Sequence, residues 1–267
     1  MKKDRVKTIS LLNRREMLGF IGGIVSVLLV GWLRGQSASA KPTPSCVVKP
    51  QQTEGPYFVD EKLNRSDIRS DPSDSSVKQG VPLRLAFQVS RIDGSSCAPL
   101  MDAIVDIWHC DAMGVYSDAT DRSFNTVGKK FLRGYQVTDA NGTVEFVTIY
   151  PGWYPGRTVH IHFKIRTNSA SEQSYEFTSQ LYFDDALTDQ IHAPSPYAAK
   201  GQRTLNNDRD GIFQGGGEQL MLQLGELPDA DRKAIERGLP NSSATALTVV
   251  DLRPYGFGLT LPPWAVA

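Results

Sequence analysis

Residues 150–165 read Tyr-Pro-Gly-Trp-Tyr-Pro-Gly-Arg-Thr-Val-His-Ile-His-Phe-Lys-Ile, and the second half of this stretch decides the fold. Apolar and polar side chains alternate there, which is the pattern of a β-strand with one buried face. The polar face carries His160 and His162. Residues i and i+2 of a strand project the same way, about 6.5 to 7 Å apart, so both imidazoles can bind one metal ion through nitrogen atoms about 2 Å from it. The stretch therefore predicts a strand that carries half of a metal site.

A loop rich in proline and glycine comes directly before this strand. It contains Tyr154 and Arg157. Because turns in such loops aim side chains at the end of the following strand, we expect a phenol and a cation beside the two imidazoles.

Strand patterns recur along most of the chain, whereas only residues 228–238 show helix start and stop signals. Asn141-Gly142 is a strong hairpin signal. Many short strands with Gly/Pro turns and little helix predict an all-β protein that forms a sandwich or a barrel, and we expect a β-sandwich of short, mostly antiparallel strands with long loops. The other expected strands are 83–90, 103–109, 131–138, 143–149, 177–183 and 218–224.

The two ends of the chain have a different composition. Residues 41–52 are rich in Pro, Ser, Thr and Gln and are expected to form a linker or an N-terminal arm. Residues 239–267 are expected to form an irregular tail that lies on the body or on a partner subunit. The β-sandwich domain with this tail is thus predicted to span residues 53–267.

The charge is unevenly distributed, although the chain has 29 basic and 29 acidic side chains. Residues 1–40 carry a net charge of +5, which leaves −5 for the remainder. A mildly acidic body without a basic stripe argues against nucleic-acid binding.

Residues 1–40 have the pattern of a targeting segment: a basic start, an apolar run over 18–33 and small residues at 37–40. Residues 13–18, Asn-Arg-Arg-Glu-Met-Leu, resemble a twin-arginine export signal, with Asn and Met at positions where Ser or Thr and Phe are common. The apolar run is shorter than the roughly 20 residues that span a bilayer. We therefore expect export to the periplasm or the exterior with no stable membrane span after cleavage; retention of the segment as an anchor is the alternative.

The chain has three cysteines, Cys46, Cys97 and Cys110. An exported protein can keep disulfides. If Cys97 lies in the turn before a strand over about residues 101–109, Cys110 lies at the far end of that strand, more than about 20 Å away, which is too far for a bridge. Any disulfide should therefore involve Cys46.

A second loop offers another phenol. Residues 108–117 follow the end of an expected strand and read Trp-His-Cys-Asp-Ala-Met-Gly-Val-Tyr-Ser. This loop places Tyr116 at a strand end, just as the first loop places Tyr154. Two phenols and two imidazoles make a donor set of two nitrogen and two oxygen atoms. Phenolate is a hard anionic ligand that suits ferric iron. Zinc is the alternative, although zinc sites favour His, Cys and carboxylates. We interpret His109, on the strand before this loop, as structural.

Together these stretches resemble the intradiol ring-cleavage dioxygenases, the family of protocatechuate 3,4-dioxygenase and catechol 1,2-dioxygenase. The resemblance is carried by residues 53–58, 106–117, 131–135, 151–163 and 180–183 and covers the chain from about residue 50 to 225. It implies a non-haem Fe³⁺ enzyme. Such an enzyme inserts both atoms of O2 into a catechol-type ring and cleaves it between the two hydroxyl-bearing carbons to a cis,cis-muconate.

The resemblance also implies a role for each matched residue. Tyr116 would be the phenolate that stays on the iron and Tyr154 the one that dissociates when substrate binds. Arg157 would stabilise negative charge on the ring. The same resemblance makes His160 and His162 the imidazole ligands, and Gln180 and Tyr57 residues of the substrate pocket.

Several alternatives remain open at this stage. Gly156 stands where protocatechuate enzymes carry Trp, which leaves the substrate among the catechols undecided. The same histidines could hold zinc or copper, or the sandwich could be a non-catalytic module of the cell envelope. A homodimer is a further open alternative.

Overall fold

The computed structural model describes residues 48–93, 96–167, 175–226, 247–249 and 257–260. The predicted helix at 228–238, the expected targeting segment and Cys46 lie outside these ranges. Within them, no helix is both long and apolar enough to cross a membrane.

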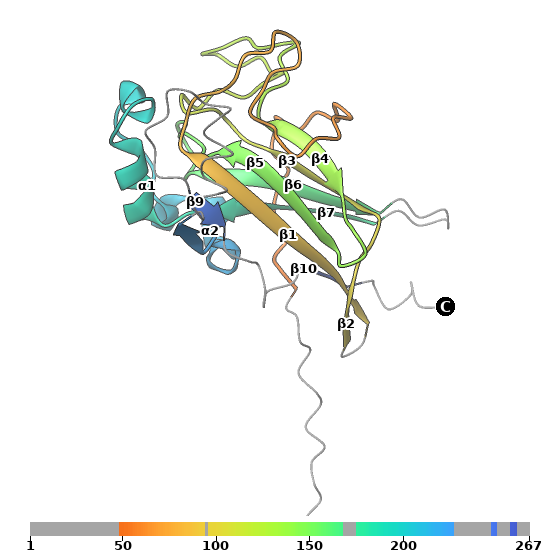
Figure 1. Cartoon of the computed structure of the whole chain (residues 1–267). Helices are drawn as coiled ribbons and strands as arrows, with labels where there is room; N and C mark the ends of the chain where they lie inside the picture. Colours follow the sequence, from red (N-terminus) through yellow and green to blue (C-terminus); the bar gives the residue numbers. More distant parts are fainter. Residues whose placement is uncertain (1–47, 94–95, 168–174, 227–246, 250–256, 261–267) are drawn as a thin grey trace, which may run out of the picture. The chain divides into compact units, whose positions relative to one another are not determined.

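Two β-sheets make up the domain (Figure 1). One sheet is antiparallel throughout, in the order β4-β3-β6-β7. Its strands are β4 (Arg133–Val137), β3 (Ala103–Trp108), β6 (His160–Thr167) and β7 (Glu176–Tyr182). The other sheet is built on β1, with β5 and β2 antiparallel to it and β9 and β10 parallel. Its strands are β1 (Pro82–Asp93), β2 (Ser96–Pro99), β5 (Thr143–Ile149), β8 (Leu224–Glu226), β9 (Leu247–Val249) and β10 (Phe257–Thr260).

The hydrophobic core lies between the two sheets, which confirms the predicted sandwich. Alternate residues of β1, from Leu83 to Val89, are fully buried, as are Ile161, Phe163 and Ile165 of β6. The rings of Phe87 and Phe163 meet across the two layers with their centroids 5.5 Å apart. Since apolar side chains of β6 fill this core, its polar side chains must face the other way.

Within the described ranges, helices are few and short. They are α1 (Asp185–His192), α2 (Gly211–Gln214) and the 3-10 turns η1 (Tyr197–Lys200), η2 (Asn207–Arg209) and η3 (Gly217–Leu220). The sequence analysis missed α1, although the side chain of Asp184 caps its first turn by accepting a hydrogen bond from Leu187 N.

Three strand predictions need correction. Asn141-Gly142 forms a tight turn, but β4 pairs with β3 whereas β5 pairs with β1, so the turn joins the two sheets and no hairpin forms. A turn sequence fixes the local backbone, while the choice of partner depends on which sheet buries the apolar face. Residues 218–224 were predicted as a strand, yet η3 occupies their start, after Gly216 at φ +111°. The tail is not wholly irregular either, because β9 and β10 pair with β1.

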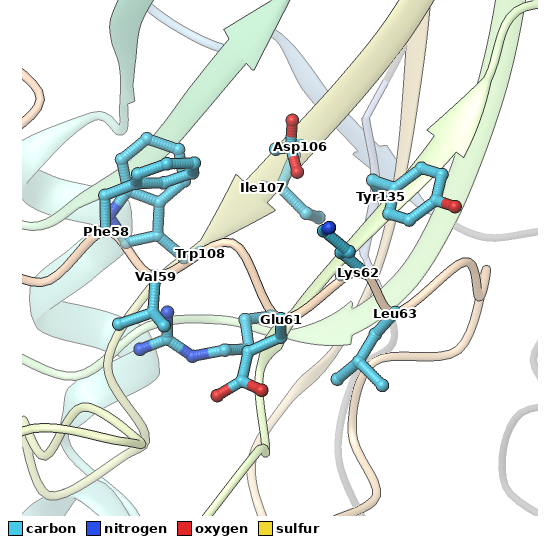
Figure 2. Close-up of a pocket in the computed structure, with 11 residues that line it drawn as sticks. Phe58, Val59, Glu61, Lys62, Leu63, Asp106, Ile107, Trp108 and Tyr135 are labelled. Carbon is cyan, nitrogen blue, oxygen red and sulfur yellow. The ribbon is translucent and has the colours of Figure 1, made fainter.

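An N-terminal strap, residues 50–63, crosses the outer face of the β4-β3-β6-β7 sheet. Backbone hydrogen bonds hold both ends, from Gln52 N to Thr178 O and from Tyr135 N to Leu63 O. Between them, Phe58 packs on Trp108 with ring centroids 4.8 Å apart (Figure 2). The strap therefore covers the polar face of β6, where the predicted metal site lies.

Two cationic side chains of β6 bind the strap to the sheet. Lys164 forms ion pairs with Glu54 and Glu176 and lies over the ring of Phe58. Arg166 bridges Asp60 of the strap and Asp106 of β3. Burial raises the pKa of Asp106 to about 6, against the opposing effect of Arg166. The strap is thus held by buried and half-buried charge pairs.

The cysteines agree with the spacing argument. Cys97, in β2, is disulfide-bonded, and Cys110 is buried and free. Cys97 and Cys110 are therefore not joined to each other, as predicted.

Candidate metal and active site

Two imidazoles converge on the outer face of β6. The Nε2 atoms of His160 and His162 lie 3.0 Å apart, and both residues are 1% exposed. The Nδ1 atom of His160 lies 2.7 Å from the carbonyl oxygen of Thr158, which requires a proton on Nδ1 and leaves the lone pair on Nε2. His162 stacks on Trp108, whose ring is 6° from parallel. Packing on one ring and a backbone carbonyl on the other therefore orient the two rings.

Burial keeps both imidazoles neutral. Desolvation lowers the pKa of His160 to about 3, with the charge of Arg157 adding to the effect. The pKa of His162 is also lowered well below its usual value, first by burial and then by His160. Neutral imidazole is the form that binds metals, so the site presents two nitrogen lone pairs at neutral pH.

The two predicted phenols lie beside these rings. The hydroxyl of Tyr154 is 3.2 Å from His160 Nε2, and the rings of Tyr116 and Tyr154 have centroids 5.7 Å apart. The Tyr116 hydroxyl is buried and has no hydrogen-bond partner in the described part of the chain. Burial raises the pKa of both phenols. A buried phenol without a partner is costly, unless something binds its oxygen.

The tyrosines come from two loops that interlock through glycines. We call them the Tyr116 loop (residues 109–118) and the Tyr154 loop (residues 150–159). Gly114 has φ +74°, and a Cβ atom there would lie 2.1 Å from the carbonyl oxygen of Trp153. A Cβ on Gly152 would lie 2.4 Å from the carbonyl oxygen of Ala112. The glycines thus allow the two backbones to touch, and this contact sets the spacing between the phenols.

These donors fit a metal ion. Two nitrogen lone pairs and two phenol oxygens gather in a buried space, and one of the oxygens lacks a partner. No group of three or more His, Cys, Asp or Glu side chains is arranged to hold a metal elsewhere in the described ranges. The two phenols supply hard oxygen donors in place of carboxylates, which is chemistry that suits ferric iron.

Arg157 lies at the edge of this cluster and is held rigidly. Its Nε donates to Asp210 Oδ2 at 2.8 Å, and one terminal nitrogen donates to Gln180 Oε1 at 2.5 Å. Gln180 in turn donates to the backbone of Thr53 at 2.9 Å. Asp210 is 2% exposed and also accepts hydrogen bonds from the first turn of α2. The cation is therefore fixed from both sides.

The strap closes the remaining side of the cluster. Gly55 lies against His162, where a Cβ atom would be 3.3 Å from the ring carbon Cε1. Tyr57 stacks on Tyr116, with ring centroids 4.3 Å apart, and meets Tyr154 edge-on at 6.4 Å. The strap thus forms an aromatic wall beside the phenols.

The structure brings together every residue that the sequence analysis selected for the site; their roles as ligands and catalytic groups stay predictions. His109 is buried between the Cys110 carbonyl and Thr148, in agreement with a structural role. Sequence reasoning missed Asp210 and Trp108 as partners of site residues. Asp210 caps a helix from a segment 53 residues after Arg157, and no local pattern reports such a distant pairing.

Comparison with known proteins finds a matching family model and several similar proteins. Residues 53–211 match the family model described as dioxygenase. The chain is 31% identical over 157 residues to the protocatechuate 3,4-dioxygenase beta chain of Burkholderia cepacia, an alignment that covers 54% of this chain and 65% of the relative. It is 27% identical over 165 residues to catechol 1,2-dioxygenase 1 of Acinetobacter lwoffii, with 51% and 49% covered.

A solved structure is similar over a larger share of the fold. The intradiol ring-cleavage dioxygenase from Tetranychus urticae matches with a TM-score of 0.60 and 30% identity, over 82% of this chain and 96% of that chain. The family model and this structure lead to one conclusion: the chain belongs to the intradiol ring-cleavage dioxygenase family.

Proposed function

We propose that this protein is an exported, non-haem Fe³⁺ dioxygenase that cleaves catechol-type rings between the two hydroxyl-bearing carbons, with both atoms of O2 entering a cis,cis-muconate. One observation carries the proposal. Two phenol oxygens and two imidazole nitrogens converge in a buried space beside a fixed arginine. Family membership supports the reaction class, while the iron and the export route are our own inference.

Four side chains would hold the iron: Tyr116, Tyr154, His160 and His162. When bound, ferric iron supplies Lewis acidity and accepts electron density, which makes a bound catecholate reactive toward O2. A trivalent cation also favours the phenolate form, which offsets the raised pKa of the two buried tyrosines.

The two phenols differ in a way that supports different roles. Tyr116 is 1% exposed, whereas Tyr154 is half-buried. The half-buried phenol can swing away with its loop when a catechol approaches. Its oxygen can then take one of the two protons that a catechol must lose to bind as a dianion. We assign Tyr116 to permanent ligation and Tyr154 to exchange and proton transfer.

Arg157 acts on the substrate ring. Its guanidinium stays charged, because pairing with Asp210 raises its pKa against the desolvation that lowers it. A fixed cation stabilises negative charge that builds up on the ring during the reaction, without reorganising. Gln180 holds one terminal nitrogen and thereby sets the direction of the others.

Colour and oxygen uptake test the proposal together. The purified, iron-loaded protein should be red to burgundy from charge transfer between phenolate and iron, and should consume O2 with at least one member of a panel of catechols. Colourless protein with stoichiometric zinc, or protein with stoichiometric copper in place of iron, would support the metal-binding alternative. Red protein that consumes no O2 with any catechol would support a non-catalytic module.

The export route has its own test. We propose that residues 1–40 direct the protein out of the cytoplasm by the twin-arginine route and are then removed. Substitution of both Arg14 and Arg15 with Lys should retain the precursor in the cytoplasm, as measured by fractionation and N-terminal sequencing. Unchanged export of this double variant would contradict the route but not the enzyme activity.

A further inference from the structure

Asp121, an exposed residue, is hydrogen-bonded to Tyr57 in the aromatic wall of the site. Tyr57, whose ring contacts both Tyr116 and Tyr154, donates its hydroxyl hydrogen to Asp121 Oδ2 at 2.7 Å. Tyr57 is fixed from behind as well, because Arg133 donates to its carbonyl oxygen at 3.2 Å. The carboxylate therefore has a defined position beside the wall, although the loop that carries it faces solvent.

This carboxylate is ionised at neutral pH. The hydrogen bond from Tyr57 lowers the pKa of Asp121 below its usual value, and hydrogen bonds from the backbone of Ser123 and Arg122 act in the same direction. The pKa of Tyr57 rises to about 12, first through burial and then through Asp121. The Tyr57 hydroxyl therefore keeps its proton, and the pair carries one negative charge.

The other charges that face the cluster are largely balanced. The guanidinium of Arg157 is paired with Asp210, and the ammonium of Lys164 is paired with two glutamates. Arg133 is buried and donates to Ser117 and to the backbone. Asp121, in contrast, accepts from a neutral phenol, and Arg122 beside it in sequence is exposed and has no ion-pair partner among the described residues.

We propose that Asp121 sets the charge preference of the site, so that catechols with an anionic ring substituent are disfavoured relative to neutral and cationic ones. The inference deepens the proposed function and rests on it. Because Tyr57 contacts both phenols and holds Asp121, a ring bound at the phenols would lie near Tyr57, and a substituent that points outward would approach the carboxylate. Like charges raise the free energy of the bound state, and opposite charges lower it.

The expected effect is moderate because the group is exposed. Two unit charges about 9 Å apart at an effective dielectric constant of about 40 interact enough to change an equilibrium about fivefold. Salt screens charges at such a surface, with a Debye length of about 8 Å at physiological ionic strength. A charge effect should therefore fade in high salt, whereas an effect of shape should not.

The experiment compares three catechols with similar substituents at the same ring position and different charge. They are 3,4-dihydroxyphenylacetate, 4-methylcatechol and dopamine, with charges of about −1, 0 and +1 at neutral pH. The kcat/KM of the iron-loaded enzyme is measured by oxygen uptake at low and at high ionic strength. We expect Asp121→Asn to raise the kcat/KM for the anionic substrate, relative to that for the neutral one, about fivefold. The kcat/KM for the cationic substrate relative to the neutral one should fall. Both ratios should lose their salt dependence.

Two further variants complete the design. Asp102→Asn removes the same charge from an exposed residue directly before β3, about 20 Å along that strand from the site, and should leave the ratios unchanged. Tyr57→Phe keeps the ring but removes the hydroxyl that holds the carboxylate, so its ratios should move in the same direction as those of Asp121→Asn.

The outcomes separate the two levels of inference. Unchanged ratios in Asp121→Asn, or an equal change in Asp102→Asn, would overturn the role of Asp121 and leave the proposed function intact. Absence of turnover with every catechol would refute the proposed function, and this inference with it.

Discussion

The Tyr116 loop and the Tyr154 loop are built alike but differ in how firmly they hold their phenols. Each contains a glycine that touches the backbone of the other loop, and each begins beside a buried histidine. His109 holds the start of the Tyr116 loop through the Cys110 carbonyl, and His192 donates to the Pro151 carbonyl at 3.0 Å in the Tyr154 loop. Only the Tyr116 side chain, however, is fully enclosed. If the two phenols bind iron as we propose, the enclosed one is suited to permanent ligation and the half-buried one to exchange.

The largest effect should come from substituting the two tyrosines one at a time. Tyr116→Phe removes the enclosed oxygen, and we expect loss of bound iron and a fall in kcat/KM of at least about 100-fold. Tyr154→Phe should retain iron with a shifted charge-transfer band, because the enclosed phenol of Tyr116 and both imidazoles remain. Metal analysis and visible spectra measure both. Tyr135→Phe, a half-buried tyrosine on β4, serves as the control. Equal iron loss in the Tyr116 and Tyr154 variants would show that the two loops do not differ.

A second prediction concerns the anchor of Arg157 in the Tyr154 loop. Asp210→Asn keeps the size of the side chain but removes the charge that Arg157 faces at 2.8 Å. We expect kcat to fall about 10- to 100-fold while colour and iron content stay unchanged, since the cation loses its fixed direction. Asp208→Asn, an exposed acid two residues earlier, is the matched control. An unaltered kcat in Asp210→Asn would mean that Gln180 alone suffices to orient Arg157.

A third prediction separates steric contact from backbone strain. Gly114→Ala combines φ +74° with a clash against the Trp153 carbonyl, whereas Gly156→Ala has φ +88° with no atom within 4 Å. We expect the free energy of unfolding to fall by about 3 to 4 kcal/mol for Gly114→Ala and by about 1 to 2 kcal/mol for Gly156→Ala. Denaturant unfolding measures both values. Similar losses of unfolding free energy in the two variants would indicate that the two loops can move apart at little cost.

The last prediction is a dependence of stability on pH through His109, which develops only as the pH falls below neutral. Burial lowers its pKa from 6.5 to about 4. Because the folded state has the lower pKa, this stability is complete above pH 6.5 and is lost as the pH falls toward 4. For a single buried group the loss at pH 4 is about 3 kcal/mol. Urea unfolding of metal-free protein between pH 7 and pH 4 should therefore show a shallower slope for His109→Gln than for the wild type. Parallel slopes would contradict the assignment.

The sequence was informative where a local pattern has a single physical meaning. Alternation over residues 159–165 placed His160 and His162 on one face of β6, and loops with glycine placed Tyr116 and Tyr154 at strand ends. Pairing over long distances was not accessible. Asn141-Gly142 gave the turn correctly but the wrong partner strand, because partners are chosen by which sheet buries the apolar face.

The same limit explains what was missed in the site. Asp210 caps α2 and faces Arg157 across 53 residues of chain, and Trp108 reaches His162 only through the pairing of β3 with β6. Helix α1 was missed because its mixed polar and apolar sequence, Asp-Ala-Leu-Thr-Asp-Gln-Ile-His, is short and shows little periodicity. Local rules thus found the donors, and the tertiary structure supplied the groups that orient them.

The two faces of β6 have different tasks, and even and odd residue numbers distinguish them. Even-numbered residues from His160 to Arg166 meet the strap and the site, and odd-numbered residues from Ile161 to Ile165 fill the core. Insertion or deletion of one residue within this strand would exchange the faces, bury imidazoles among phenylalanines and destroy metal binding and fold in one event. Changes in chain length should therefore be tolerated only outside β6, the strap and the two tyrosine loops, where they leave the donors in place.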